Sequence, residues 1–262
     1  MEAGASVRTL RRPANGDWTT TVIEAIDETT AVVALPQCHW IDGSLFDIER
    51  ISDVCHDKAI GLALDVTQSV GALPLDVRRI QPDFLAAATY KWLMGPYALG
   101  LLYVSKRWQE EGRPIEHNWI HRKNADNFAR LVDYQDELAS GAQRFDVGER
   151  SNFALVPAAE AGIRQVLDWG VENISETLGS MTQTIADRAR ALGLDSVPSD
   201  RRAGHYLGLT MASGLPDDLP AELAKRDVFV SVRGSSIRIT PHVYNDERDI
   251  ERLMSALTDR VG

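Results

Sequence analysis

The sequence is organised around the stretch Ala87-Ala88-Thr89-Tyr90-Lys91-Trp92-Leu93-Met94-Gly95-Pro96, which sets a lysine between an apolar run and a Gly-Pro turn. The residues on either side of the lysine, 83–88 and 99–104, are apolar enough to predict two buried strands. Lysine side chains usually reach back to water, where the ammonium group is hydrated. A lysine between two predicted buried strands therefore has two interpretations. Its side chain reaches water, or its amine takes part in chemistry.

The chemical task that suits Lys91 is attack on a carbonyl group. Partial burial lowers the pKa of a lysine amine, so that more of it is unprotonated and able to condense with an aldehyde, such as that of pyridoxal phosphate. From this stretch alone, the solvated surface lysine stays open as the alternative.

The composition is that of an ordinary globular protein, with 44% hydrophobic and 25% charged residues in a chain of 262. This length suits one large domain, or a medium domain with a small appendage. A net charge of -10 argues against nucleic-acid or anionic-membrane partners, and no run of about 20 apolar residues predicts a membrane span. Cys38 and Cys55 have neither disulfide-framework nor zinc-site spacing, so we expect a cytoplasmic protein.

The first part of the chain alternates strand and helix patterns. We expect a large α/β domain over residues 1–160, with a mostly parallel sheet flanked by helices. Its predicted elements are a helix at 19–26, strands at 31–35 and 61–64, an amphipathic helix at 45–58, and the strands at 83–88 and 99–104. Residues 106–150 are irregular and rich in charge and aromatic rings, which is typical of a functional or interface segment.

The second part, residues 161–262, predicts a long helical link and a small α+β domain. Helix patterns cover 158–169 and 171–192, with a break at Gly170. The small domain is predicted to have strands at 205–211, 228–232 and 236–240 and helices at 216–226 and 245–261. Asn245 is the predicted N-cap of the last helix.

Asp65 and Gln68 join Lys91 in one candidate site. Asp65 ends the apolar strand at 61–64, and a buried carboxylate needs a cationic partner, which a pyridinium nitrogen would provide. A protonated ring would then withdraw electrons from the Cα carbon of an amino acid, and Gln68 would hydrogen-bond its phenolic oxygen. Taken singly, Asp65 is also interpretable as a helix N-cap and Gln68 as a first-turn helix residue.

Four motifs resemble the class V aminotransferase group of fold-type I pyridoxal-phosphate enzymes, which includes cysteine desulfurases, kynureninases and isopenicillin epimerase-like proteins. They are Asp65-x-x-Gln68, Thr89-Tyr90-Lys91-Trp92-Leu93-x-Gly95-Pro96, Arg144-Phe145-Asp146-Val147-Gly148-Glu149-Arg150 and Ile237-Arg238-Ile239-x-Pro241-His242-x-Tyr244-Asn245. The resemblance runs from about residue 18 to the C-terminus. It implies a fold-type I large domain, shortened at its N-terminus, followed by a small C-terminal domain.

The resemblance also implies residue roles. Asp65 would meet the pyridine nitrogen, Gln68 the phenolic oxygen and Lys91 the aldehyde. A phosphate contact is implied for Tyr90, assisted by Thr89, and a grip on the substrate α-carboxylate for Arg238, which is otherwise interpretable as a surface strand arginine. The loop that approaches the cofactor contains His39 and Trp40. Members of the group are homodimers, so residues 106–150 are expected to reach the partner's cofactor.

The sequence departs from this family in two ways. No cysteine precedes Arg238 in the segment 231–237, so persulfide chemistry is not expected. Residues 1–60 also have no strand, small-residue loop and helix start that would cradle the cofactor phosphate. Two hypotheses follow: an enzyme acting at Cα by transamination or β-elimination, or a shortened, non-catalytic or split homologue. The second predicts exposed apolar surface near residues 1–30 and a chain that supplies the N-terminal part.

Overall fold

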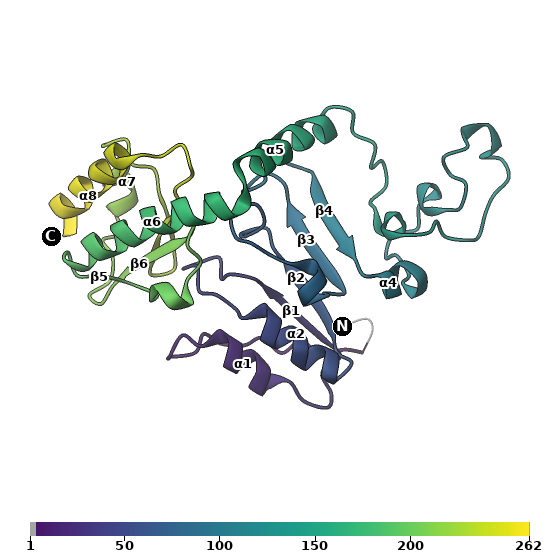
Figure 1. Ribbon diagram of the computed structural model, residues 1–262, viewed down its shortest axis with the longest axis horizontal. Helices are drawn as coiled ribbons and strands as arrows, with labels where there is room; N and C mark the ends of the chain where they lie inside the picture. Colours follow the sequence, from purple (N-terminus) through teal and green to yellow (C-terminus); the bar gives the residue numbers. More distant parts are fainter. Residues whose placement is uncertain (1–3, 262) are drawn as a thin grey trace.

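The computed structural model describes residues 4–261, which form two sheets joined by a long pair of helices (Figure 1). The first sheet has the order β1-β2-β3-β4, with β1 at Val32–Pro36, β2 at Gly61–Asp65, β3 at Phe84–Ala88 and β4 at Gly100–Val104. The first three strands are parallel, whereas β4 runs antiparallel to β3. The predicted mostly parallel sheet is therefore confirmed.

Helices α1 (Trp18–Ala25) and α2 (Ile48–Asp57) cover one face of this sheet, and α3 (Val77–Ile80) precedes β3. Helix α2 begins at Ile48 rather than at residue 45, because the Asp47 carboxylate accepts a hydrogen bond from the backbone N–H of Arg50 and so caps the helix. Apolar side chains from the two helices and from alternate strand positions form the larger core, which includes Trp18, Val22, Ile51, Leu62, Leu64 and Leu85.

The opposite face of the first sheet is open to solvent within residues 4–261. Burial alternates along the strands, so that Ala34 in β1 and Ala86 in β3 are exposed while their neighbours in sequence are buried. Val32 is 60% exposed. Sheets of parallel strands are normally covered on both faces, so this surface, which we call the open face, is unusual. Exposed apolar sheet and helix surface was predicted near residues 1–30; Val7, 67% exposed, and Val32 lie there, and the open face continues across the sheet to β3.

Strand β4 is more exposed than predicted, because it lies at the border of the open face. The segment 99–104 was expected to be buried, but Leu101 and Leu102 are 44% and 41% exposed, and only Val104 in this strand is buried. Leu102 pairs with Ala86 across the ladder, at the border of the open face. An apolar strand at the edge of a sheet with one open face has few side chains to pack against.

Two helices link this sheet to the second one. They are α5 (Leu155–Trp169) and α6 (Val171–Arg190), separated at Gly170, whose φ of 80° lies in the left-handed region that favours glycine. The predicted break at Gly170 is therefore confirmed. None of the helices in residues 4–261 is both long and apolar enough to cross a membrane.

The second sheet has the order β5-β6-β8-β7 and is antiparallel throughout. Its elements are β5 (Leu194–Ser196), a 3-10 turn at Ser199–Arg201, β6 (Leu207–Met211), α7 (Leu219–Ala224), β7 (Ser231–Arg233), β8 (Ser236–Ile239) and α8 (Glu247–Val261). The short β5 was not predicted. The predicted N-cap of α8 was wrong: the Asp246 carboxylate accepts from the N–H groups of Arg248 and Asp249, whereas the Asn245 side chain accepts from His242.

Residues 112–153 form an arm that projects away from the first sheet (Figure 1). It follows α4 (Lys106–Glu111) and holds 3-10 turns at Trp119–His121, Phe128–Arg130 and Ala142–Phe145. The buried guanidinium of Arg144 fixes its base by donating to the backbone carbonyls of Glu110, Gly112 and Ala139. The predicted irregular segment is therefore tied down by a single arginine where it leaves the sheet.

The contact of α5 with the lysine loop gives a first prediction. A Cβ atom at Gly162 would lie 2.6 Å from the carbonyl oxygen of Leu93 and 2.7 Å from that of Met94. We expect Gly162→Ala to lower the free energy of unfolding by about 1–3 kcal/mol, because backbone atoms cannot give way. Urea denaturation measures this change.

Gly179→Ala is the matched control, because the nearest atom to a Cβ there is the Cα of Gly204, at 3.8 Å. In α6 this substitution should be neutral or stabilising by about 0.5–1 kcal/mol. Equal effects of the two substitutions would contradict the packing of α5 against the lysine loop.

Candidate active site

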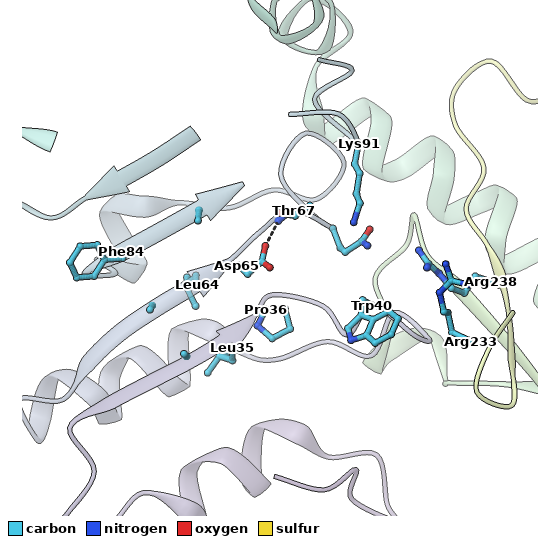
Figure 2. A pocket seen from close by; sticks show the side chains of 14 residues that line it. Leu35, Pro36, Trp40, Leu64, Asp65, Thr67, Phe84, Lys91, Arg233 and Arg238 are labelled. Carbon is cyan, nitrogen blue, oxygen red and sulfur yellow. Dashed lines mark hydrogen bonds between the residues drawn. The ribbon is translucent and has the colours of Figure 1, made fainter. Parts of the chain in front are cut away.

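A pocket of about 730 Å³ lies where the carboxyl ends of β1 and β2 meet the second sheet. Parallel strands of an open α/β sheet end at one edge, and ligands bind there. The end of β2, the loops after β1, β2 and β3, and strands β7 and β8 contribute the polar residues of its lining, and Figure 2 shows their side chains around one space. The pocket brings together five of the predicted site residues: Trp40, Asp65, Gln68, Lys91 and Arg238.

Asp65 ends β2 with its carboxylate exposed. One carboxylate oxygen accepts a hydrogen bond of 2.9 Å from the backbone N–H of Thr67, and the residues that follow form turns rather than a helix, so Asp65 is no helix N-cap. The expectation of a buried carboxylate was wrong, because Asp65 points to the open face. Its other oxygen makes no hydrogen bond within residues 4–261 and can accept one from a ligand.

The loop that carries Gln68 is held by a histidine from the second sheet. The Nε2 atom of the fully buried His205 lies 2.6 Å from the backbone carbonyl of Gln68, to which it donates. The imidazole also packs edge-on against Trp92, next to the candidate lysine, with ring centroids 4.6 Å apart. Burial lowers the pKa of His205 to about 4, although its hydrogen bond to Gln68 opposes this shift. His205 is therefore neutral at pH 7 and touches both loops of the pocket.

Lys91 extends from its loop into the pocket and is half-buried (Figure 2). Burial, and next the positive charge of Arg238, lower the pKa of its amine, while the charge of Asp65 partly opposes them. The loop itself is tight: a Cβ atom at Gly95 would lie 2.6 Å from the Cβ of Thr89. The direction of the lysine pKa shift is the one predicted from the sequence.

Thr89 and Tyr90 lie in the lysine loop but do not line the pocket. The Thr89 hydroxyl is buried and lies 2.9 Å from the carbonyl of Pro96 and 3.0 Å from that of Leu99, so it closes the loop. The ring of Tyr90 stacks on Tyr97 with centroids 4.2 Å apart. Both residues support the lysine loop, and their contacts with a cofactor phosphate stay a prediction.

Arg238 reaches the pocket from β8, over the face of a buried tyrosine. Its guanidinium carbon lies 5.1 Å from the ring centroid of Tyr206, and its Nε atom is buried without a hydrogen-bond partner in the described residues. Burial raises the pKa of Tyr206 to about 12, so its hydroxyl stays protonated and donates to the backbone carbonyl of Trp40. One tyrosine thereby positions both Arg238 and the Trp40 loop.

The side chains of the neighbouring residues Trp40 and His39 lie in different surroundings. Trp40 is 46% exposed and lines the pocket. His39 turns away, stacks on Trp18 with centroids 5.3 Å apart, and accepts a weak hydrogen bond of 3.4 Å from the backbone N–H of Ile41. Burial lowers the pKa of His39. Its place among the cofactor-binding residues stays a prediction, and the structure supports a packing role.

Arg233 is a pocket residue that the sequence prediction missed. It pairs with Ser236 across the β7–β8 hairpin, and Ser231 pairs with Arg238. Paired residues share a face of the sheet, and so do residues two positions apart, so Arg233 and Arg238 lie on the same face. The two-residue turn Gly234-Ser235 between apolar strands is a hairpin signal in the sequence and would have placed them together.

Comparison with known proteins places the chain in a family. Residues 1–253 match the family model described as Aminotransferase class-V. The chain belongs to the class-V aminotransferase family. Among its relatives, an uncharacterized aminotransferase, YcbU, of Bacillus subtilis is 27% identical over 93% of this chain, and a probable cysteine desulfurase of Methanothermobacter thermautotrophicus is 24% identical over 100% of this chain. The chain covers 67% and 68% of those two proteins.

Solved structures, among them that of a cysteine desulfurase, show the same fold as this class-V aminotransferase family member. The apo enzyme of Thermococcus onnurineus matches with a TM-score of 0.80 and 19% identity, covering 95% of this chain and 65% of that one. A C-DES mutant with glycine covalently linked to its PLP cofactor matches with a TM-score of 0.78 and 21% identity, covering 93% of this chain and 64% of the other. The predicted fold-type I architecture is confirmed, over about two thirds of these neighbours' lengths.

The buried histidine gives this family member a pH-dependent stability. Its folded pKa of about 4 lies below its unfolded value, so unfolding takes up a proton, and the stability that neutral His205 contributes is lost as pH falls from about 6.5 toward 4. We expect the stability difference between the wild type and His205→Gln to shrink by about 2 kcal/mol from pH 7.5 to pH 5. Urea denaturation at both pH values measures it.

His117→Gln is the control, because His117 is exposed in the arm. Its difference from the wild type should stay constant over the same pH range. A constant difference for His205→Gln would contradict a neutral, buried imidazole.

Proposed function

We propose that this chain binds pyridoxal 5'-phosphate at Lys91 and acts at the Cα atom of an amino acid, by transamination or β-elimination. The observation that carries the proposal is the convergence, in one pocket, of an amine with a lowered pKa, a carboxylate with an unoccupied oxygen, and an arginine whose buried Nε lacks a partner: Lys91, Asp65 and Arg238. Family membership and the PLP-containing neighbour support this choice of cofactor.

The residues present fit the cofactor. Asp65 would hold the ring nitrogen through its available carboxylate oxygen, and the Gln68 side chain, which lines the pocket, would bond the phenolic oxygen. When bound, pyridoxal phosphate supplies an aldehyde that condenses with amines and a ring that withdraws electrons from Cα. Lys91 would carry the cofactor and afterwards, as a free amine with a lowered pKa, take or return the proton at Cα.

Arg238 and Trp40 would orient the substrate. A guanidinium held over the Tyr206 ring keeps a fixed direction, which suits bidentate binding of the α-carboxylate. Trp40 lies between the sheet and this arginine in Figure 2 and would exclude water from one side of the bound amino acid. Together these two side chains fix which bond at Cα faces the lysine amine.

The two cysteines argue against desulfurase chemistry in this chain. Burial raises the pKa of the Cys38 thiol to about 12 and that of the Cys55 thiol to about 11, so neither is an available thiolate. Neither residue lines the pocket. We therefore favour transamination or β-elimination over sulfur transfer, although several relatives are named cysteine desulfurases.

We also propose that the protein is a cytoplasmic homodimer and that the arm takes part in the dimer contact. Large apolar side chains on the arm are exposed, namely Ile115, Phe128, Val132 and Tyr134. Exposed apolar groups of this size are typical of surfaces that another polypeptide covers.

A second candidate function is a module that is completed by further polypeptide before it binds the cofactor. The open face favours it, because Val32, Ala34, Ala86 and Leu102 form an apolar surface on one side of the sheet. Covering that face would also enclose Asp65. In this case the isolated chain would bind pyridoxal phosphate weakly or not at all.

Borohydride trapping tests the proposal. We expect that mixing the purified chain with pyridoxal phosphate, reducing with borohydride and digesting it will place the label on Lys91, as located by mass spectrometry. Lys91→Ala should lose the label, since Lys91 is the one lysine of residues 4–261 that lines the pocket. Lys58→Ala, at an exposed lysine after α2, should keep it. Label scattered over surface lysines would sink the stand-alone enzyme, and no label at all would favour the second candidate.

A further inference from the structure

We propose that the substrate carries two anionic groups, the α-carboxylate held by Arg238 and a second carboxylate or similar acidic group on its side chain held by Arg233. The inference rests on the proposed function, and it narrows the substrate to acidic amino acids. Four kinds of observation carry it: the charge of the pocket, the lack of acidic partners for its arginines within residues 4–261, the register of the hairpin and the different burial of the two guanidinium groups.

The pocket is positively charged on an acidic protein. The chain has a net charge of -10, yet the pocket is lined by the cations Lys91, Arg233 and Arg238 and by a single carboxylate, Asp65. A cationic cleft on a surface of opposite sign concentrates anionic ligands. Once Asp65 is committed to a cofactor ring and Lys91 to its aldehyde, Arg233 and Arg238 have no carboxylate of residues 4–261 beside them in the pocket.

The pocket arginines lack the acidic partners that three other arginines of residues 194–261 have. Arg226, Arg248 and Arg260 each form an ion pair with an aspartate. Within residues 4–261, neither Arg233 nor Arg238 has a carboxylate within ion-pairing distance, although the chain contains 38 acidic residues. Two neighbouring arginines left without carboxylates in one pocket are typical of a site that takes anions from solution.

The register of the β7–β8 hairpin sets where the two arginines leave the backbone. Arg233 pairs with Ser236, two residues from Arg238, so the two arginines are diagonal neighbours on one face. The Cα atoms of diagonal neighbours lie about 7–8 Å apart, so the two arginine side chains start from separate points and each can bind its own carboxylate. Figure 2 shows both side chains side by side and facing the space below Lys91.

The two arginines are suited to different groups of the substrate. Arg238 is half-buried against Tyr206, and its charge contributes to lowering the pKa of Lys91, so it lies on the side of the reacting carbon. Arg233 is exposed, and in the described part of the chain its side chain donates one hydrogen bond, of 2.9 Å, to the backbone carbonyl of Val232. A guanidinium free to move at the edge of the pocket can follow side chains of different length. The α-carboxylate therefore belongs to Arg238 and the distal acidic group to Arg233.

Calorimetric titration of the purified chain tests this assignment without requiring catalysis. The probes are L-aspartate, L-glutamate and succinate, with L-alanine and acetate as their single-carboxylate counterparts. One charge-assisted contact contributes about 1.5–3 kcal/mol, so we expect the doubly anionic probes to bind about 10–100-fold more tightly. Arg233→Gln should abolish this preference, because it should weaken the doubly anionic probes far more than L-alanine and acetate. Arg238→Gln should weaken every probe. Arg252→Gln, at a distant position on α8, should change nothing.

The outcomes separate this inference from the proposed function. A preference for two carboxylates that depends on Arg233, in a chain whose Lys91 takes no cofactor, would support the anion site and overturn the enzyme. Label on Lys91 together with equal affinities for L-aspartate and L-alanine would support the enzyme and overturn the acidic substrate. A preference that survives in Arg233→Gln would also overturn it, because another group would then hold the second carboxylate.

Discussion

The pocket exists only where the two sheets meet, and the adjacent buried residues His205 and Tyr206 hold that junction. His205 donates to the backbone carbonyl of Gln68, and Tyr206 donates to that of Trp40. Both acceptors are backbone atoms in loops that follow parallel strands of the first sheet. A buried carbonyl without its donor costs about 1–3 kcal/mol, so the position of the second sheet is fixed by the loops that bear the site.

Close backbone contact makes this junction specific. A Cβ atom at Gly43 would lie 2.5 Å from the carbonyl oxygen of Tyr206, and one at Gly208 would lie 2.6 Å from the Cα of Asp42. Glycine at both positions lets the Trp40 loop lie directly on β6. The aromatic ring of Tyr206 can then contact Arg238 while its hydroxyl bonds the Trp40 loop, so Arg238 and this loop are packed together.

The sequence predicts those residues of the candidate site that a local pattern marks. It does not predict those that a hydrogen bond between distant segments brings to the site. Asp65 and Lys91 were predicted because each follows an apolar strand, and parallel strands must end at the same edge of a sheet. His205 was not predicted as a site residue, since its partner lies 137 residues away and no periodicity marks a contact between distant segments. Arg233 lay within reach of prediction through the hairpin turn beside it.

The sequence was least successful in predicting which faces of the first sheet are buried. The apolar runs that formed β1 and β4 are equally compatible with one or two covered faces, because a continuous apolar strand records its composition and not what packs against it. The burial of Asp65 was predicted wrongly for the same reason. A strand-end carboxylate is buried only if some element covers the face to which it points, and no such element lies within residues 4–261.

This exposure links the open face to the chemistry of the pocket. Charges in water at a separation of 4 Å interact by about 1 kcal/mol, whereas near a protein surface with an effective dielectric constant of 20 they interact by about 4 kcal/mol. Covering the face beside Asp65 would therefore strengthen its attraction for a ring cation and its effect on Lys91 together. The stand-alone enzyme and the module completed by further polypeptide would use the same residues. They would differ in the strength with which Asp65 and Lys91 interact with a cofactor, because that strength depends on whether the sheet is covered.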